Sequence, residues 1–145
     1  MSIDVCMLGL NNAKLLDHVV PDVFDGPVDP RWSSEFLSDP RHHLAMAVDD
    51  GQIVGFASGM HYLHPDKAPE LWINEIAVAP PHRGFGIGGR LLARLCEHGR
   101  ALGCREAWVL TDHTNAAAMR MYTTAGGFEQ PIRSTMFTFK LAAET

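Results

Sequence analysis

The chain has 145 residues, of which 46% are hydrophobic and 20% are charged, so it suits one folded domain with a single core and is not an intrinsically disordered chain. Its formal net charge of −5 argues against general nucleic-acid binding, which requires a basic surface. No apolar run approaches the about 20 residues that a membrane-spanning helix needs, so we expect no membrane association.

The first half of the chain predicts a strand, two helices and two further strands, in that order. Asn11 or Asn12 can cap the first helix, and Pro21 ends it. Two glycines in the last of these strands, Gly55 and Gly59, predict a bulge or a close approach of another chain segment. The elements cover residues 2–8, the stretch that carries Leu15, Leu16, Val19 and Val20, and residues 33–37, 43–48 and 53–62.

The second half of the chain predicts four more strands and two helices. Pro80-Pro81 ends the first of these strands, and Gly126-Gly127 ends the last helix. Beyond that helix, a short strand begins at Phe128, and residues 133–141 alternate as a final strand should. The strands before Phe128 cover residues 71–78 and 105–110, and the helices cover residues 86–102 and 116–124.

The three cysteines, Cys6, Cys96 and Cys104, are too widely spaced to form a disulfide framework or a metal-binding pattern. We expect each to be a buried, unreactive thiol. No secretory signal pattern opens the sequence, so a reducing cytoplasm is the expected location.

Residues 21–32 are rich in Asp and Pro, which predicts an ordered loop rather than a helix or a strand. The carboxylates of Asp22, Asp25 and Asp29 can form an acidic wall for a positively charged molecule. The alternative is a solvated loop that Phe24 and Trp32 anchor to the core. Both interpretations stay open on the sequence alone.

A Gly-rich turn over residues 82–90 joins the predicted strand 71–78 to the predicted helix 86–102. Backbone N–H groups at the start of a helix lack partners and attract anions, and glycine lets a phosphate approach them closely. Arg83 adds a positive charge at the same place. The turn therefore predicts a binding site for a phosphorylated cofactor.

Glu75 is a carboxylate within an otherwise apolar strand that we expect to be central in the sheet. Burial would raise its pKa and make it a useful general base, whereas a Glu75 that faces solvent or pairs with a cation would be structural. His61 and His64 at the end of the preceding strand form a His-x-x-His pair, but without a third or fourth ligand nearby we expect no metal site. We place these histidines at the surface or at the edge of a pocket.

The order of the predicted elements and two motifs resemble the GNAT superfamily of acyl-CoA N-acyltransferases. Residues 83–88 match its Arg/Gln-x-x-Gly-x-Gly/Ala pyrophosphate loop. Residues 115–122 resemble its Asn-x-x-Ala-x-x-x-Tyr motif, and Gly127-Phe128 follows one residue later than is usual. Within the superfamily the chain is most similar to type I aminoglycoside 3-N-acetyltransferases, through the aspartate after Phe24, the strand end at residues 73–78 and Leu102-Gly103-Cys104.

The resemblance implies one acetyltransferase domain over residues 1–145, of the α/β (α+β) class. Its mixed, mostly antiparallel sheet of about six or seven strands would splay at the middle and carry about four helices. Acetyl-CoA is the implied cofactor, with its pyrophosphate over the Gly-rich turn and its pantetheine arm along the strand end. The implied cofactor-binding residues are Ile76, Ala77, Val78, Arg83, Gly84, Phe85, Gly86, Ile87, Gly88, Asn115 and Tyr122. Asn115 would bind the pantetheine arm, cap its helix or do both.

The resemblance also implies that a primary amine attacks acetyl-CoA directly in a ternary complex. Glu75 is the first choice for the base and Tyr122 for the acid that protonates the departing thiolate, with Asp112 and His113 as alternative bases and His61 and His64 as weaker ones. The residues expected to bind the acceptor are Asp22, Asp25, Trp32, His61, Glu75, Asp112 and His113.

We expect the acceptor to be a small, cationic amine, either aminoglycoside-like or polyamine-like, because the predicted loop over residues 21–32 is acidic. Acetylation of a protein or peptide N-terminus and a non-catalytic acyl-CoA-binding module are the alternatives. Members of the family often dimerise, so the resemblance allows a homodimer.

Overall fold

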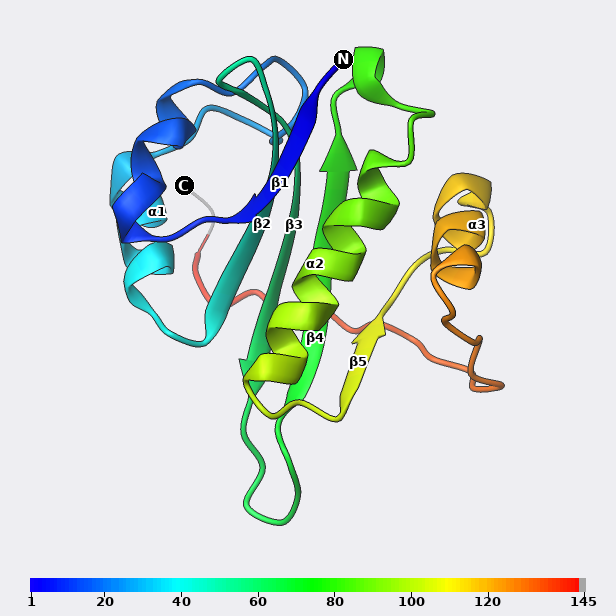
Figure 1. Ribbon diagram of the computed structural model, residues 1–145. Coiled ribbons are helices and arrows are strands. Elements are labelled where there is room, and N and C mark those ends of the chain that lie inside the picture. Colours follow the sequence, from blue (N-terminus) through cyan, green and yellow to red (C-terminus); the bar gives the residue numbers. More distant parts are fainter. Residues whose placement is uncertain (144–145) are drawn as a thin grey trace.

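Five strands form one mixed sheet in the order β1-β2-β3-β4-β5 (Figure 1). The computed structural model describes residues 1–143. Neighbouring strands from β1 to β4 are antiparallel, whereas the short edge strand β5 runs parallel to β4. The strands are β1 (Ile3–Met7), β2 (His42–Asp49), β3 (Gln52–Tyr62), β4 (Glu70–Val78) and β5 (Glu106–Val109).

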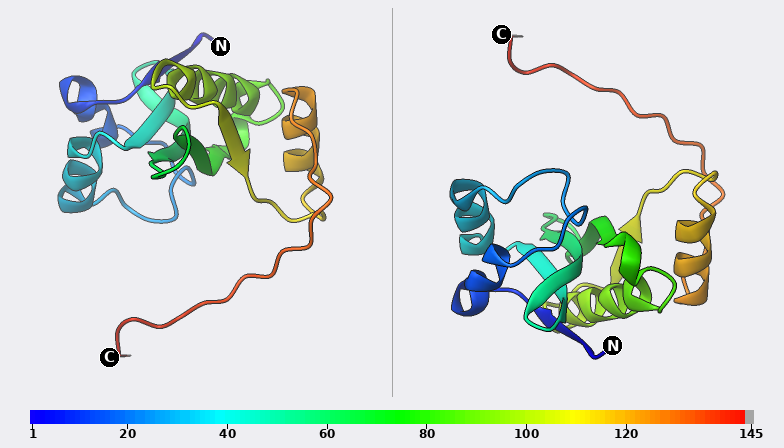
Figure 2. Two further views of the ribbon diagram at one scale, coloured as in Figure 1. Left: turned by 90° about the horizontal axis from the view of Figure 1, so that it is seen from below. Right: turned by 90° about the horizontal axis from the view of Figure 1, so that it is seen from above.

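The helices cover both faces of this sheet. The long helix α2 crosses one face, and the N-terminal helices η1 and α1 pack at the other, beside β2 and β3 (Figures 1 and 2). Helix α3 follows β5 and lies beyond the sheet edge, next to α2. The helices are η1 (Leu10–Asp17), α1 (Pro30–Ser38), η2 (Pro80–His82), α2 (Ile87–Ala101) and α3 (Ala116–Thr124), of which η1 and η2 are 3₁₀.

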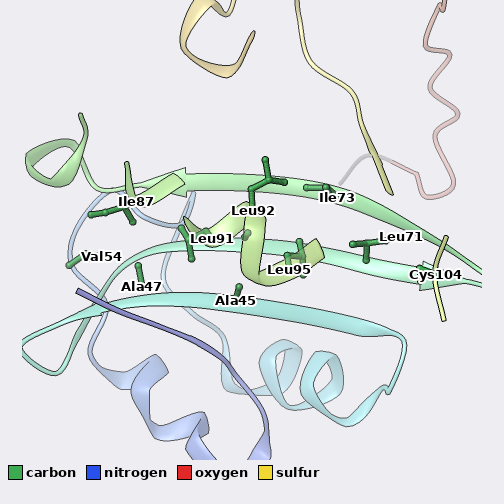
Figure 3. Packing of buried hydrophobic residues seen from close by; sticks show 11 residues of the cluster. Ala45, Ala47, Val54, Leu71, Ile73, Ile87, Leu91, Leu92, Leu95 and Cys104 are labelled. Atoms are coloured by element: carbon green, nitrogen blue, oxygen red, sulfur yellow. The ribbon is translucent and has the colours of Figure 1, made fainter. Parts of the chain in front are cut away.

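The main core lies between α2 and the strands, where the helix places apolar side chains at helical spacing. Alanines of β2 and β3 leave room for the helix, and Figure 3 shows these side chains gathered between helix and sheet. Only glycine fits at position 59 of β3. A Cβ there would lie 2.7 Å from the Trp72 carbonyl oxygen of β4 and 3.3 Å from the Leu95 side chain of α2. A register shift falls between Ser58 and Gly59, so the irregularity predicted at Gly59 is confirmed.

A second core on the opposite face ties the loop over residues 21–29 to the sheet. Val23 is buried, and the ring of Phe24 stacks on Phe56 of β3, with centroids 4.3 Å apart. Phe24 therefore anchors the acidic loop as one of the two interpretations proposed, whereas Trp32 does not, because it is 58% exposed. The cysteines are less uniform than expected: Cys104 is buried, but Cys6 and Cys96 are half-buried. Burial raises the pKa of all three thiols, which keeps them protonated and unreactive.

The predicted elements up to residue 124 are present, with small shifts of their ends. The first helix is 3₁₀ and kinks at Asn12, and Gly9 rather than Asn11 or Asn12 is its N-cap. It ends at Asp17 and not at Pro21, because Val19 and Val20 leave the helix and pair with Ile53 of β3. Asn12 instead contributes its side-chain oxygen, which accepts a hydrogen bond from the Gly9 N–H. Helix α1 begins earlier than predicted because Asp29 caps it ahead of Pro30, a residue well suited to a first turn. No helix in the described part of the chain is long and apolar enough to cross a membrane.

The two strands predicted after α3 are absent from the described residues, so the sheet has five strands rather than six or seven. The chain beyond Gly127 extends away from the body of the molecule (Figure 2). A strand needs a ladder of hydrogen bonds to a neighbour, and alternating side chains alone do not supply one. Residues 133–141 alternate as a strand would, but they are not assigned to any strand within residues 1–143.

Candidate active site

The site begins where β4 and β5 part. Strand β5 pairs with β4 only from Glu70 to Ile73, so no strand pairs with residues 76–78 on that side (Figure 1). Asn74 adds to the irregularity, since it has no partner where the register between β3 and β4 shifts. The expected splay at the middle of the sheet is therefore present, and Ile76, Ala77 and Val78 border it.

The Gly-rich turn follows β4 directly and leads into α2. Gly84 and Gly86 adopt left-handed conformations, with φ of 85° and 78°, and a Cβ at either would meet nothing within 4 Å. Gly86 is the N-cap of α2 and provides no side-chain cap, and the first turn of the helix holds no acidic residue. The N–H groups there, together with the helix dipole, are suited to bind an anion, and we call residues 83–88 the cradle.

Two side chains fix this turn to the sheet. The Arg83 Nε atom donates a hydrogen bond to the Val78 carbonyl at 2.9 Å, while the side chain stays exposed. His82 Nε2 lies 3.1 Å from a carboxylate oxygen of Asp49, at the end of β2. The positive charge of Arg83 is thus held at the junction between the splay and the cradle, where the sequence predicts a pyrophosphate. Phe85 is exposed beside it, whereas Ile87 is buried in the core.

Glu75 faces the side of the sheet opposite α2. Gly59 faces α2, so the neighbouring Ser58 faces away, and Glu75 is the cross-strand partner of Ser58. Its side chain is exposed rather than buried, because β5 has ended before this point and leaves the edge of β4 open. Partial desolvation and the nearby negative charge of Asp25 nevertheless raise its pKa, which favours the role of a base.

The acidic loop lies on the same side of the sheet as Glu75, because Phe24 packs on Phe56 in the core opposite α2. Phe24 holds the loop there through its stacking on Phe56. The other loop residues are placed differently. Asp22 is exposed in a left-handed conformation, with φ of 67°, and Asp29 caps α1. Trp32 stacks against the Arg31 guanidinium and lines an open hollow with Glu35, Phe36, Asp39 and His42.

Beyond the splay, α3 carries the residues of the second motif. The Asn115 side chain accepts a hydrogen bond from the Ala118 N–H at 3.1 Å, so it caps the helix, one of the two roles predicted for it. Tyr122 packs against the main core, and burial raises its pKa, so it keeps its proton at neutral pH. A protonated phenol next to the splay is suited to act as an acid.

Asp112 and His113 lie in the turn between β5 and α3. The Asp112 carboxylate accepts hydrogen bonds from the N–H and the hydroxyl of Thr114, which lower its pKa and make it a weaker base. His113 is exposed and lies 2.7 Å from a carboxylate oxygen of Glu129. The pKa of the Glu75 carboxyl group is raised and that of Asp112 is lowered, so Glu75 is the stronger base of the two carboxylates.

His61 is not brought together with Glu75. It lies on the α2 face of β3, where its Nδ1 atom is 2.7 Å from Nε2 of His43. His43 in turn meets the His98 ring of α2 edge-on, so three histidines join β2, β3 and α2. His64 instead lies 3.7 Å from Glu70. Among the described residues, no group of three or more His, Cys, Asp or Glu side chains is arranged to hold a metal ion.

The His43 cluster predicts that the protein loses stability in acid. Desolvation and the neighbouring histidines lower the pKa of His43 to about 4, below the ordinary value near 6.5. As pH falls from about 6.5 to about 4 the unfolded chain therefore binds more protons than the folded one, and folding loses up to about 3 kcal/mol. Urea unfolding between pH 7.5 and 4.5 measures this slope.

The matched variants for this prediction are His43→Gln and Gln52→Asn. The first should flatten the dependence of unfolding free energy on pH, and the second, which exchanges one exposed, non-titrating side chain for another, should leave it unchanged. An equal slope in the wild type and His43→Gln would contradict the assignment.

The structure adds an aromatic group that the sequence did not single out. Trp72 stacks on Trp108 with centroids 5.9 Å apart, and the Trp108 Nε1 atom donates to the Tyr62 hydroxyl, which itself donates to Glu70. These contacts hold β3, β4 and β5 together where the splay closes. The contact between the two tryptophans depends on strand register, since Trp72 and Trp108 are paired neighbours on β4 and β5. The sequence alone does not give that register.

Comparison with known proteins supports this geometry. The model of the acetyltransferase (GNAT) family matches residues 13–128. Streptothricin acetyltransferase of Streptomyces lavendulae is 33% identical over 109 residues, which are 74% of this chain and 54% of that protein. The N-alpha-acetyltransferase RimI of Mycobacterium tuberculosis is 35% identical over 104 residues, 72% of this chain and 63% of that protein.

This chain thus spans between about half and two thirds of the length of these relatives. Among solved structures, the aminoglycoside N-acetyltransferase AAC(6')-Iy in complex with CoA superposes with a TM-score of 0.75 at 22% identity, over 97% of this chain and 96% of that one. The family match covers most of the sequence, from within the first helix to Phe128. It includes both motifs on which the resemblance rests, residues 83–88 and 115–122. The chain belongs to the acetyltransferase (GNAT) family.

Proposed function

We propose that this chain is an acetyl-CoA-dependent N-acetyltransferase that acetylates a primary amine of a small, cationic acceptor. One observation carries the proposal: the unpaired end of β4 runs directly into an open, Arg-flanked anion cradle at the start of α2. Acetyl-CoA is the acyl donor of the GNAT family. We take residues 1–145 as one cytoplasmic acetyltransferase domain.

In this proposal, the cradle formed by Arg83 to Gly88 binds the pyrophosphate of acetyl-CoA. The pantetheine arm lies along residues 76–78, where β4 has no neighbour on the side of β5. A backbone N–H near Ala77 or Val78 stabilises the oxyanion that develops on the thioester carbonyl, an effect typically worth about 10²-fold or more in rate. Asn115 supports the site by fixing the start of α3.

The acceptor binds on the Glu75 side, between β4 and the acidic loop. Asp25 and Glu75 lie close enough for their charges to interact, so this side attracts a cationic amine. An alkylammonium group has an ordinary pKa near about 10, so it must lose a proton before it can attack. Glu75 accepts that proton. Asp22, Trp32, Asp112 and His113 remain candidates for contacts further along the acceptor.

The transfer is a direct displacement within the ternary complex. The amine nitrogen forms a bond to the acetyl carbon, and the carbon–sulfur bond of the thioester breaks. Glu75 takes the first proton, which the ammonium group loses before it attacks, and Tyr122, whose burial keeps it protonated, gives a proton to the departing CoA thiolate. The nitrogen loses its second proton as the amide forms; this proton restores Tyr122, and Glu75 releases the first to solvent. Acetylated amine and CoA leave.

Acetylation of a peptide N-terminus is the second candidate. The 35% identity to an N-alpha-acetyltransferase favours it. Residues 21–29 argue against it, since Phe24 holds this loop beside Glu75, where an extended peptide would need room. A homodimer is compatible with either acceptor.

Thiol release from acetyl-CoA across a panel of amines tests the proposal. We expect turnover with an aminoglycoside or with spermidine, and turnover at least about tenfold slower with a peptide that has a free N-terminus. Preference for the peptide would favour the second candidate. CoA binding without thiol release from any amine would favour a non-catalytic acyl-CoA-binding module, and absence of CoA binding would overturn both readings.

The left-handed turn predicts a specific loss of cofactor affinity. Gly86→Ala strains the backbone of the cradle and should weaken CoA binding by about tenfold in isothermal titration calorimetry. Gly103→Ala is the matched control, because Gly103 has a similar φ of 91° with nothing within 4 Å but lies beyond the far end of α2. Equal CoA affinities in the two variants would argue against the cradle.

A further inference from the structure

A bulge in β4 places Glu75 and Trp72 on the same face of the sheet. Glu75 pairs with Ser58 and Trp72 pairs with Met60, and residues two apart on β3 face the same side. In a regular strand, residues three apart point to opposite faces, so the extra residue Asn74 is what turns Glu75 to the face of Trp72. The two side chains therefore occupy neighbouring positions on the face opposite α2, about 7 Å apart along the strand.

Trp108 extends this aromatic surface onto β5. It is the register partner of Trp72 on the parallel strand, and the two rings stack with centroids 5.9 Å apart and planes 25° apart. Trp108 is nevertheless 37% exposed. We call Trp72 and Trp108 the tryptophan wall. The wall borders the open stretch of β4 that carries Glu75, because β5 ends at Val109.

The polar groups around the tryptophan wall already have partners. The Trp108 Nε1–H donates to the Tyr62 hydroxyl at 2.8 Å. Glu70, two residues before Trp72, accepts a hydrogen bond from the same hydroxyl at 2.6 Å and lies 3.6 Å from the Lys67 ammonium group. The wall therefore offers a ligand the apolar surface of two indoles rather than a charge.

This arrangement suits an amine that is carried on a saturated ring. Indole rings attract C–H groups with partial positive charge, such as those beside an ammonium group. The two indoles pack on each other, so a ligand lies against their outer surface and not between them. A ring covers more of this surface than an open chain with the same amine spacing, and it loses less conformational freedom on binding.

We propose that Trp72 and Trp108 form a subsite for the ring of a cyclic amine, such as an amino sugar or an aminocyclitol, whose amine is directed at Glu75. The inference rests on the N-acetyltransferase function proposed above, and it narrows the acceptor from cationic amines in general to those borne on a saturated ring. The negative charge of Asp25, which acts on Glu75, attracts the ammonium group, and the tryptophan wall selects the body that carries it.

Steady-state kinetics with two matched diamines test the subsite. The compound cis-1,3-diaminocyclohexane carries two amines on a saturated ring, and 1,3-diaminopropane carries them at the same carbon spacing on an open chain. The wild type should have a kcat/KM at least about tenfold higher for the cyclic diamine. Trp108→Leu should reduce this preference by about tenfold, through KM rather than kcat, because Glu75 and the cradle are unchanged.

Two further variants separate the indole surface from the fold. Trp108→Phe keeps an aromatic ring but loses the hydrogen bond to Tyr62, so it should retain the preference within about threefold. Leu10→Ala removes an exposed apolar side chain from η1 and should leave the preference unchanged. CoA affinity, measured by isothermal titration calorimetry, should be the same in all variants and shows that each is folded. Equal loss of the preference in Trp108→Phe and Trp108→Leu would overturn the subsite.

Indole N–H resonances give a readout that does not depend on turnover. Addition of cis-1,3-diaminocyclohexane to the CoA-bound protein should shift the resonances of Trp72 and Trp108, and the spectrum of Trp108→Phe identifies the second of these. Thiol release without a ring preference, or a preference that Trp108→Leu leaves intact, would overturn the subsite and leave the proposed function standing. No thiol release with any amine would overturn the proposed function. Unshifted indole resonances would overturn the subsite whether or not the chain transfers acetyl groups.

Discussion

Glu75→Gln is expected to lower kcat by about 10²–10³-fold and to remove the acidic limb of the pH–rate profile. In the wild type the rate should fall as pH drops through the raised pKa of Glu75, because the protonated carboxyl group cannot accept the proton of the amine. The glutamine side chain has a similar size and no titrating group. The ratio of the wild-type kcat to that of Glu75→Gln should therefore be largest above the pKa of Glu75 and should become smaller in acid. Steady-state kinetics from pH 5 to pH 9 measure it.

Two further variants make this prediction specific. Glu97→Gln removes an exposed carboxylate from α2 and should change neither kcat nor the profile. Asp25→Asn removes the negative charge that helps to raise the pKa of Glu75, so its acidic limb should move to lower pH. If the acidic limb persists unchanged in Glu75→Gln, another group is the base.

Tyr122→Phe should lower kcat by about 100-fold while the affinity for CoA stays within about twofold, because the phenylalanine keeps the packing and loses only the proton donor. Burial raises the pKa of Tyr122, so the wild-type rate should also decline only at strongly alkaline pH. Stopped-flow measurement of thiol release gives the rate of the chemical step, and a separate measurement of CoA affinity shows whether the substitution changes cofactor binding.

The other tyrosine of the chain provides the control. Tyr62 bridges Trp108 and Glu70 at the closed end of the splay, so Tyr62→Phe should cost about 1 kcal/mol of stability and leave kcat within a few-fold. Equal turnover of Tyr122→Phe and the wild type would remove Tyr122 as the acid. Loss of CoA affinity in Tyr122→Phe would instead indicate a role in positioning the cofactor.

The sequence predicts the parts of this structure that local patterns determine. Helix α3 has the predicted bounds because Asn115 caps it and Gly126-Gly127 follows it, and both signals lie within a few residues of the helix. The anion cradle is likewise local, since Gly84 and Gly86 need only their own backbone conformation. Such features depend on neighbours along the chain.

Features that depend on distant neighbours were harder to predict. The exposure of Glu75 follows from β5 ending at Val109, which no pattern around Glu75 encodes. His61 faces α2 because of the register of β3 against its neighbours, and a shift of one residue would have turned it to the other face. Residues 133–141 have the pattern of a strand, but a strand also needs a hydrogen-bonded neighbour, and in the described part of the chain this segment is in no sheet.

The stacking of Phe24 on Phe56 fixes the backbone of the acidic loop on the side where we propose that the acceptor binds. Because Phe24 is held by the core, the backbone around it keeps its place when the adjoining side chains change. Asp22 and Asp25 are exposed on either side of this anchor. A mutant library at Asp25, joined by Asn or Gly at Asp22, whose φ of 67° suits only such residues, would therefore vary the charge offered to the proposed acceptor while the backbone of the loop stays in place. The loop is thus a natural starting point for redirecting the enzyme to neutral or anionic amines.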